Sequence, residues 1–407
     1  MIKSLKMLTG LVVFAVISAQ TIVAQAKSPS VELGPRPFYL VDDMDEGPLK
    51  EKLSACAADF TASRTMFSIS HRGAPLQFPE HTKQGYLAGA RMGAGRVECD
   101  VTFTKDKELV CRHSQCDLAT TTDILARPEL AAKCSKPFAA GSGATCCTSD
   151  LTLAEYMSLN GKMDAANKKA STAAEYMDAT AKWRTDLYAA KATLVTHKQS
   201  IELIKSAGAK FIPELKTPSV SMPFDGFSQS DFIEKLISEY KAANIPASDV
   251  NIQSFNLEDI LYLIKNHPEY GKQAAWLDAR FRSGGFNSDN ADTFSPSMGE
   301  LYERGVRFIA PPMWMLVKIG DDGMLVPSAY AKEAKKAGLD IITWTLERSG
   351  PLISGGGWYY KTAGGVIDND GDMYQMLDVL AMKVGIKGIF SDWPATVTFY
   401  ANCMGLK

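Results

Sequence analysis

The feature that most restricts the fold is a regular alternation of short apolar runs with segments of helical periodicity. Eight runs predict buried strands, over residues 67–70, 96–104, 210–215, 250–254, 274–277, 307–310, 339–345 and 388–390. The segments between them predict helices, over residues 84–94, 200–207, 231–243, 257–266, 298–304, 330–337 and 374–384. Strands that alternate with helices form a parallel sheet, and eight such units predict an α/β fold of the (β/α)8 TIM-barrel type. A doubly wound open sheet is the alternative, but no glycine-rich dinucleotide-binding motif follows the first run.

The alternation is interrupted between residues 115 and 195. This segment contains four cysteines, a patch rich in glycine, serine and threonine over 141–149, and a stretch rich in alanine and lysine over 161–190. We expect one or two polar helices in the last stretch. The apolar content is low for an independent core, so we predict a cysteine-containing insertion after the second strand rather than a separate domain.

The first 26 residues have the order of a cleavable secretory signal. Lys3 and Lys6 precede an apolar run over 8–19, and the small residues Ala24 and Ala26 frame a cleavage site. The apolar run is shorter than the roughly 20 residues that span a bilayer, and no later run qualifies. We therefore expect an exported protein, periplasmic or secreted, without stable membrane insertion. The predicted segments are a signal peptide over 1–26, an N-terminal extension over 27–66, a barrel domain over 67–400 that carries the insertion over 115–195, and a C-terminal tail over 401–407.

All eight cysteines follow the predicted signal. An even number of cysteines in an exported chain predicts disulfides, although eight cysteines allow 105 pairings. We expect Cys56 to tether the N-terminal extension to the barrel. Cys99 lies between two inward-facing carboxylates, so we expect it to be a free, buried thiol. A zinc cluster is the alternative, but paired Cys-x-x-Cys spacings are missing from the sequence.

Some cysteines are close enough in sequence to suggest partners. We expect a local bridge between Cys111 and Cys116, which enclose a loop of four residues. Cys134 is expected to pair with either Cys146 or Cys147. The sequence leaves the other pairings open.

Residues that can carry acid–base and metal chemistry gather between positions 68 and 118. His71 and His113 are candidates for a general acid and base, because imidazole titrates near physiological pH. Glu98 and Asp100 alternate along a predicted strand and therefore face the same side, where carboxylate oxygens suit a hard divalent cation. The alternatives are structural histidines and a solvated acidic face, but the flanks of this strand are apolar.

The barrel prediction places polar residues at the carboxyl ends of strands, where the catalytic groups of such barrels lie. The residues concerned are His71 after the first strand, Glu98 and Asp100 in the second, Glu214 and Lys216 at the third, Gln253 at the fourth and Trp344 at the seventh. Side-chain chemistry and position along the strands thus predict the same site.

Several short motifs, in order and at barrel spacing, resemble the glycerophosphodiester phosphodiesterase family. They are HRG from position 71 with PEHT from 79, ECD from 98 with TKD from 104, His113 with a following threonine run, and PELK from 213. The weaker motifs QSF, WT and GIFSDWP fall at the fourth, seventh and eighth strands. The resemblance covers residues 67–400, apart from the insertion.

The resemblance implies metal-dependent hydrolysis of small glycerophosphodiesters to glycerol 3-phosphate and an alcohol. By this resemblance, His71 and His113 would be the general acid and base, and Glu98, Asp100 and Glu214 would bind Ca²⁺ or Mg²⁺. Arg72 and Lys216 would bind the phosphate, and Glu80 would support the site at its rim. Gln253 and Trp344 would make further contacts with the substrate. A glycerol hydroxyl of the substrate would be the nucleophile, and water would open the resulting cyclic phosphate.

Two positions depart from the family pattern. His81 stands where the family has asparagine, and Ser114 where it has aspartate. The second change removes an orienting partner of His113, a role that we assign to the expected bridge between Cys111 and Cys116. Two other functions stay open: a phospholipase that acts on intact lipid, and a phosphodiester-binding protein that has lost turnover.

The charge balance argues against nucleic acid as a partner. The 44 lysines and arginines oppose 46 aspartates and glutamates, for a net charge of −2, and no basic stripe is present. The sequence leaves the oligomeric state open.

Overall fold

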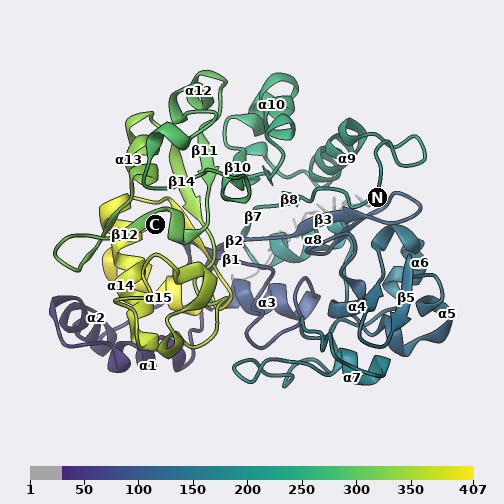
Figure 1. The fold of residues 1–407 in the computed structure, drawn as a ribbon, viewed down its shortest axis with the longest axis horizontal. Coiled ribbons are helices and arrows are strands. Elements are labelled where there is room, and N and C mark those ends of the chain that lie inside the picture. Colours follow the sequence, from purple (N-terminus) through teal and green to yellow (C-terminus); the bar gives the residue numbers. More distant parts are fainter. Residues whose placement is uncertain (1–29) are drawn as a thin grey trace, which may run out of the picture.

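Eight parallel strands surround the centre of the computed structural model, whose described residues are 30–407 (Figure 1). The strands are β1 (Thr65–Ser70), β2 (Ala94–Val97) continued by β3 (Asp100–Phe103), β7 (Lys210–Phe211) continued by β8 (Glu214–Leu215), β9 (Gln253–Ser254), β10 (Ala275–Leu277), β11 (Phe308–Ala310), β14 (Asp340–Thr343) and β15 (Gly388–Ser391). Each overlaps one of the predicted strands. The predicted signal peptide over 1–26 lies outside the described residues.

Neighbouring strands pair in parallel around the barrel. β1 pairs with β15 on one side and with β2 on the other. Ser70 of β1 lies opposite Ser391 of β15 and opposite Val97 of β2. β2 then pairs with β7, and β3 with β8, so the two halves of the second strand face the two halves of the third. The remaining pairs lead through β9, β10, β11 and β14 back to β15. The predicted (β/α)8 barrel is therefore confirmed, and the open-sheet alternative is wrong.

Apolar side chains fill the inside of the barrel. They are Ile69, Ile212, Ala275, Leu277, Ala310, Ile342 and Phe390. Alternate residues of a strand point to opposite sides, so the residues between these pack outward against the helices. Because the centre is filled, a ligand site must lie at one end of the barrel.

Helices cover the outside of the barrel (Figure 1). They are α3 (Lys83–Arg91), α8 (His197–Ser206), α9 (Gln229–Ala242), α10 (Leu257–Asn266), α12 (Met298–Glu303), α13 (Ala329–Lys336), α14 (Met373–Asp378), which continues as a π-helix over Val379–Val384, and α15 (Ala395–Met404). In α9 the hydroxyl of Ser228 accepts from the backbone N–H of Asp231, whose carboxylate accepts from the backbone N–H of Ser228. This capping box satisfies two N–H groups that the helix leaves free, and Phe232 and Leu236 are buried against the barrel.

The insertion over 115–195 builds a lobe beside the barrel, at the lower right of Figure 1. Its elements are α4 (Leu118–Thr121), α5 (Pro128–Ala131), β5 (Lys136–Ala139), β6 (Gly143–Thr145), α6 (Leu153–Met157) and α7 (Ala173–Met177). Leu118, Ile124, Leu151 and Tyr156 belong to an apolar cluster centred on this lobe, so the expectation of too little apolar content is wrong. Of the one or two polar helices expected over 161–190, one forms, the five-residue α7. A short helix without a continuous apolar stripe is not stable in water by propensity alone.

The N-terminal residues form two helices that the sequence analysis did not predict. These helices are α1 (Arg36–Asp43) and α2 (Pro48–Ala58). Farther along the chain, β12 (Val317–Ile319) and β13 (Leu325–Pro327) form a hairpin that was also not predicted. The rings of Phe38 and Phe60 contact Phe399 of α15, with centroids 5.2 and 5.0 Å away. α15 itself runs to Met404, across the predicted boundary at residue 400.

Four disulfides join the eight cysteines. The pairs are Cys56–Cys403, Cys99–Cys111, Cys116–Cys147 and Cys134–Cys146. The pairing of Cys134 with one of two neighbours is confirmed, and the neighbour is Cys146. Cys56 tethers α2 to α15, as expected of the N-terminal extension.

The expected bridge between Cys111 and Cys116 is wrong, and so is the expectation that Cys99 is a free thiol. β4 (Leu109–Cys111) folds back antiparallel on β3, which places Cys111 opposite Val101. Cys99 lies in the break between β2 and β3, so it meets Cys111 across the two strands. A disulfide of this kind depends on the strand break, which the sequence does not reveal.

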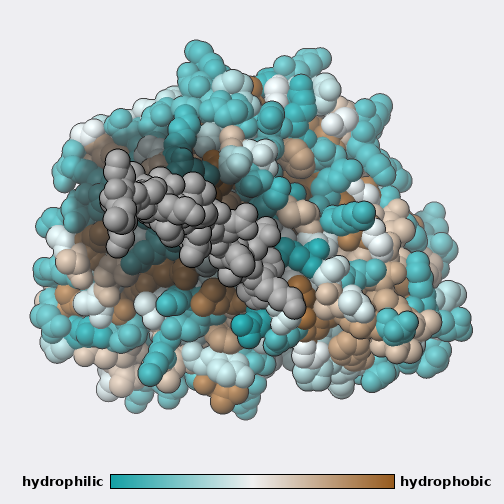
Figure 2. Space-filling model, turned by 180° about the vertical axis from the view of Figure 1, so that it is seen from behind, coloured by the Kyte–Doolittle hydropathy of each residue, from teal (hydrophilic) through white to brown (hydrophobic). Residues whose placement is uncertain are grey.

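Among residues 30–407 no helix is both long and apolar enough to cross a membrane. On the face in Figure 2, hydrophilic side chains dominate and apolar patches lie between them.

Candidate active site

A cavity of about 440 Å³ opens at the carboxyl ends of the barrel strands. The predicted residues that line it are His71, Arg72, Glu98, Asp100, His113, Glu214, Lys216, Gln253 and Trp344. Glu80 does not line the cavity but is buried beside it. The barrel thus brings together side chains that are far apart in the sequence.

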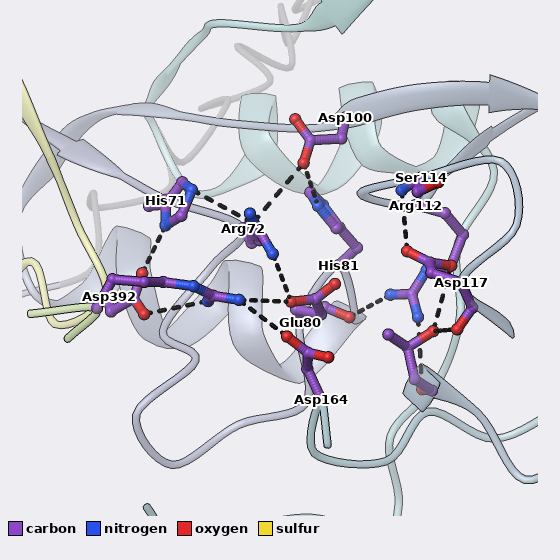
Figure 3. Close-up of polar contacts among 12 residues, drawn as sticks. His71, Arg72, Glu80, His81, Asp100, Arg112, Ser114, Asp117, Asp164 and Asp392 are labelled. Carbon is purple, nitrogen blue, oxygen red and sulfur yellow. Dashed lines mark hydrogen bonds and ion pairs between the residues drawn. The ribbon is translucent and has the colours of Figure 1, made fainter. Parts of the chain in front are cut away.

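His71 follows β1, and both nitrogens of its ring have partners (Figure 3). Nε2 accepts from Nε of Arg72 at 3.2 Å, and Nδ1 therefore donates to Oδ1 of Asp392 at 2.5 Å. Burial, and after it the positive charge of Arg72, lower the pKa of His71 to about 4, against the opposing effect of Asp392. The ring is neutral near pH 7 and carries its lone pair on Nε2.

Asp392 is a residue of the site that the sequence analysis did not single out. It follows β15 within the GIFSDWP motif, to which we had assigned no role. Its side chain is fully buried, which favours the neutral form, but the positive charge of Arg348 and the hydrogen bond from His71 outweigh burial and lower the pKa of Asp392. The motif was therefore a usable signal for this carboxylate.

Glu98, Asp100 and Glu214 form a buried acidic cluster. One carboxylate oxygen of each lies within 4.8 Å of the others. Asp100 begins β3 and lies opposite Glu214 of β8 in the parallel pair. Burial, and after it the charge of Asp100, raise the pKa of Glu98 well above its usual range and that of Glu214 to about 8.

The donor set of this cluster fits a hard divalent cation. Oδ1 of Asp100 and Oε1 of Gln253 are buried and have no hydrogen-bond partner within residues 30–407. Carboxylates this close repel one another in a medium of low dielectric constant, and a cation between them removes that cost. Oxygen atoms are the ligands that Ca²⁺ and Mg²⁺ prefer.

Arg72 and Lys216 bring positive charge to the same cavity. Arg72 has a φ of 54°, a left-handed conformation that is uncommon for a residue with a side chain. In this conformation its backbone N–H donates to Oε2 of Glu98 at 2.9 Å, and its Nη1 donates to Oε2 of Glu80 at 3.0 Å. Nζ of Lys216 lies 2.6 Å from Oε1 of Glu214. We expected Glu80 to support the site at its rim. It is instead buried beside the cavity, where it binds the guanidinium of Arg72.

His81, which replaces the asparagine of the family pattern, is fully buried and does not line the cavity. Its Nε2 donates to Oδ2 of Asp100 at 2.9 Å, and its Nδ1 accepts from the hydroxyl of Tyr86 at 2.8 Å. A histidine in this position fixes the carboxylate of Asp100, as residues behind metal ligands commonly do.

His113 lines the cavity, but its ring makes no hydrogen bond to any residue of the described range 30–407. A ring nitrogen of His113 lies within 4.8 Å of carboxylate oxygens of Glu80 and Asp117. Oδ2 of Asp117 accepts from the backbone N–H of Ser114 at 2.9 Å. Asp117 is thus a carboxyl group near the ring of His113, but it makes no hydrogen bond to the ring among residues 30–407. Burial, and then the charge of Arg72, lower the pKa of His113.

The other side of the cavity is aromatic. Trp344 and Trp358 stack with ring centroids 5.9 Å apart, and Tyr359 packs edge-on against both. Phe281 and Arg282 complete this wall. Trp358 and Tyr359 come from a glycine- and aromatic-rich run after β14, whereas no sequence motif marks Phe281 or Arg282.

Sequence comparisons agree with this geometry. The chain matches the model of the glycerophosphoryl diester phosphodiesterase family over residues 71–396. It is 45% identical over 249 residues to a protein of Arthroderma benhamiae named "Extracellular protein", a match that covers 60% of this chain and all of that one. It is 22% identical to the glycerophosphodiester phosphodiesterase GDPD6 of Arabidopsis thaliana, over 82% of this chain and 85% of the relative.

Solved structures show the same fold. A putative glycerophosphoryl diester phosphodiesterase from Silicibacter pomeroyi superposes with a TM-score of 0.55 at 15% identity, over 85% of this chain and 95% of the other. One from Agrobacterium tumefaciens gives 0.52 at 18% identity, over 84% and 99%. Because the family model extends from His71, directly after β1, to the start of α15 and so covers most of the chain, the chain belongs to the glycerophosphoryl diester phosphodiesterase family.

Proposed function

We propose that the protein hydrolyses glycerophosphodiesters to glycerol 3-phosphate and an alcohol, with two histidines as general acid and base. The observation that carries the proposal is one cavity lined by two neutral histidines, three carboxylates and three cationic side chains. Cleavage of a phosphodiester needs a proton acceptor, a proton donor and positive charge around the phosphate, and this cavity offers each. The family and the name of the Arabidopsis relative support the same reaction class.

His71 is the proposed general base. Asp392 accepts its Nδ1–H and so keeps the lone pair on Nε2. When the guanidinium of Arg72 turns to the phosphate, Nε2 is released and takes the proton of the glycerol hydroxyl that attacks the phosphorus. Its lowered pKa keeps the ring neutral, and therefore ready to accept a proton, at pH 7.

His113 is the proposed general acid for the leaving alcohol. After burial, the charges of Arg72 and Lys216 hold its pKa down in the free enzyme. A bound phosphate carries the opposite charge, so it raises the pKa of His113 when the substrate arrives. The negative charge of Asp100 favours the protonated form of His113.

Glu98, Asp100 and Glu214 would hold a divalent cation, Ca²⁺ or Mg²⁺. When bound, the cation polarises the phosphate and favours ionisation of the attacking hydroxyl. Gln253 donates from Nε2 to Oε1 of Glu98 at 2.8 Å and thereby orients this ligand. Lys216 places an ammonium group beside the cluster, where it would bind phosphate oxygens as a point charge.

The disulfide between Cys99 and Cys111 should support catalysis, because it ties the strand of the acidic cluster to the strand that leads to His113. The bridge between Cys134 and Cys146 is a matched control: both pairs are separated by 12 residues, but the second lies in the insertion. Serine replacement of either pair should cost about 3 kcal/mol of unfolding free energy, measured in urea. Only the Cys99→Ser, Cys111→Ser protein should lose turnover, by about 10-fold. Full turnover in both folded variants would show that the bridge does not position His113.

One observation favours a second candidate function, hydrolysis of intact lipid. The segment that supplies Trp358 and Tyr359 to the cavity also exposes apolar side chains, with Ile353 81% and Trp358 41% exposed. Apolar side chains at the mouth of a site suit contact with a lipid surface. Release of a phosphorylated headgroup or phosphatidic acid from phosphatidylcholine vesicles, faster than any release from glycerophosphocholine, would favour this function.

We also propose that the protein is exported. Four disulfides are typical of chains that fold in an oxidising compartment, and the Arthroderma relative is named an extracellular protein. N-terminal sequencing of the protein from its native source would test the predicted cleavage after Ala26.

The products identify the reaction. Incubation with glycerophosphocholine should give glycerol 3-phosphate and choline in equal amounts, together with a transient cyclic glycerophosphate. Glycerol and phosphocholine as products would contradict the proposed bond cleavage. No product from any of several glycerophosphodiesters would favour the phosphodiester-binding protein.

A further inference from the structure

A network of charges, most of them buried, extends from His71 and Arg72, and Figure 3 shows part of it. It contains three arginines and three carboxylates, namely Arg72, Arg184, Arg348, Glu80, Asp164 and Asp392. The side chains of Glu80 and Asp392 are only 1% and 0% exposed. Carboxylates at this depth are stable as charges only when cations pair with them, so the arrangement of the arginines matters.

Arg348 is the centre of this network. Its Nη1 donates to Oδ2 of Asp392 at 3.1 Å, and its Nη2 reaches Oδ2 of Asp164 at 2.9 Å and Oε2 of Glu80 at 3.4 Å. The other oxygen of Asp392 accepts the Nδ1–H of His71. One guanidinium therefore connects Asp164 with the proposed general base.

Two members of the network come from the insertion over 115–195. They are Asp164, which binds Arg348, and Arg184, which donates to Oδ2 of Asp392 at 3.4 Å. Arg184 also reaches the backbone carbonyl of Asp164 at 3.4 Å, and its side chain is only 6% exposed. A lobe that merely covers the barrel would gain little from burying the guanidinium of Arg184, because desolvation of a charge is costly.

We propose that the insertion is part of the catalytic machinery, and that Asp164 and Arg184 are positioning residues which fix His71 through Arg348 and Asp392. The inference rests on the proposed role of His71. Asp164 holds Arg348 in place, and Arg184 gives Asp392 a second donor on the oxygen that faces away from His71. With this carboxylate fixed, the ring keeps one orientation and one tautomer, as efficient proton transfer requires.

The charges of the network are balanced, which allows a sharp test. Loss of Asp164 leaves an excess of positive charge, and loss of Arg184 leaves an excess of negative charge. Loss of both restores the balance. Residues that act through one network show non-additive effects when they are replaced together.

The experiment compares Asp164→Asn, Arg184→Gln and the double variant in glycerophosphocholine hydrolysis. Asp164→Asn should lower kcat by about 10-fold to 100-fold. KM should change by less than about 2-fold, because neither side chain lines the cavity. The double variant should lose no more than Asp164→Asn alone.

Matched controls are Asp178→Asn and Lys168→Gln, which change exposed charges of the same insertion. Both should keep the kcat of the unaltered protein. Unchanged kcat in folded Asp164→Asn would overturn the proposal, and so would a double variant whose loss is the product of the two single losses. A rise in KM at constant kcat would mean that the insertion binds substrate instead.

A second readout does not depend on turnover. The ¹⁵N spectrum of the His71 ring should show a slowly exchanging Nδ1–H in the unaltered protein, and Asp164→Asn should weaken or remove this signal while the control variants keep it. If the unaltered protein hydrolyses no glycerophosphodiester but this signal responds as expected, the proposed function fails and the positioning role stands. An unchanged signal in Asp164→Asn would contradict the positioning role.

Discussion

Replacing His71 with alanine should lower kcat for glycerophosphocholine hydrolysis by about 10²-fold to 10⁴-fold, the range that general acid–base catalysis supplies. The ring is buried, neutral near pH 7 and fixed by Asp392, so its Nε2 lone pair can accept a proton. The alanine variant should keep its affinity for the substrate, because Arg72 and Lys216 remain. Initial rates over a range of substrate concentrations separate kcat from KM.

His267→Ala is the control for this variant. His267 lies at the protein surface, where its Nε2 is 2.7 Å from Oε1 of Glu234, far from the cavity in the fold. Its replacement should leave kcat unchanged. Turnover of His71→Ala within about 2-fold of the unaltered protein would exclude His71 as the general base.

Replacing Glu214 with glutamine should lower activity by a similar factor, because it removes a proposed ligand of the cation. Removal of one of three carboxylates should abolish tight binding of the cation, and loss of several kcal/mol of transition-state stabilisation lowers kcat/KM by about 10³-fold. The metal-free variant should unfold at the same temperature as the unaltered protein or at a higher one, because a carboxyl group whose ionisation in this buried cluster is costly is removed.

Calorimetry with and without Ca²⁺ or Mg²⁺ separates these effects. Saturating cation should raise the unfolding temperature of the unaltered protein but not that of Glu214→Gln. Glu258→Gln, a change of an exposed carboxylate, is the control and should respond as the unaltered protein does. If the cation stabilises Glu214→Gln to the full extent, the acidic cluster is not its site.

The barrel could be predicted because its determinants are local. Short apolar runs between helical segments fix the order of strands and helices, and the parallel order follows from the crossovers. The candidate residues could be located for the same reason, since the carboxyl ends of parallel strands meet at one end of a barrel. For example, Glu98 and Glu214 are 116 positions apart in the sequence, and they line one cavity because their strands end at the same end of the barrel.

What the sequence did not predict depends on contacts between distant segments. Asp392 is 321 positions from His71, and Arg348 is 184 positions from Asp164. No local period or spacing encodes such pairs. The disulfide partner of Cys99 was missed because it depends on the strand break at Glu98 and Cys99, which is a tertiary feature.

The insertion was misjudged for a different physical reason. Its apolar residues are spread over many short elements, so no window of the sequence has the periodicity of a packed helix or strand. Together they still form a buried cluster. The same spread conceals Asp164 and Arg184, which look like ordinary surface charges in the sequence and lie against the barrel in the fold.

The central claim, metal-dependent hydrolysis of glycerophosphodiesters, is tested most directly by glycerol 3-phosphate release from glycerophosphocholine before and after EDTA treatment. We predict steady release by the untreated protein, its loss in EDTA, and its recovery when Ca²⁺ or Mg²⁺ is added in excess. A folded, metal-supplied protein that releases no glycerol 3-phosphate from any glycerophosphodiester, or one whose release is unaffected by EDTA, would contradict the account.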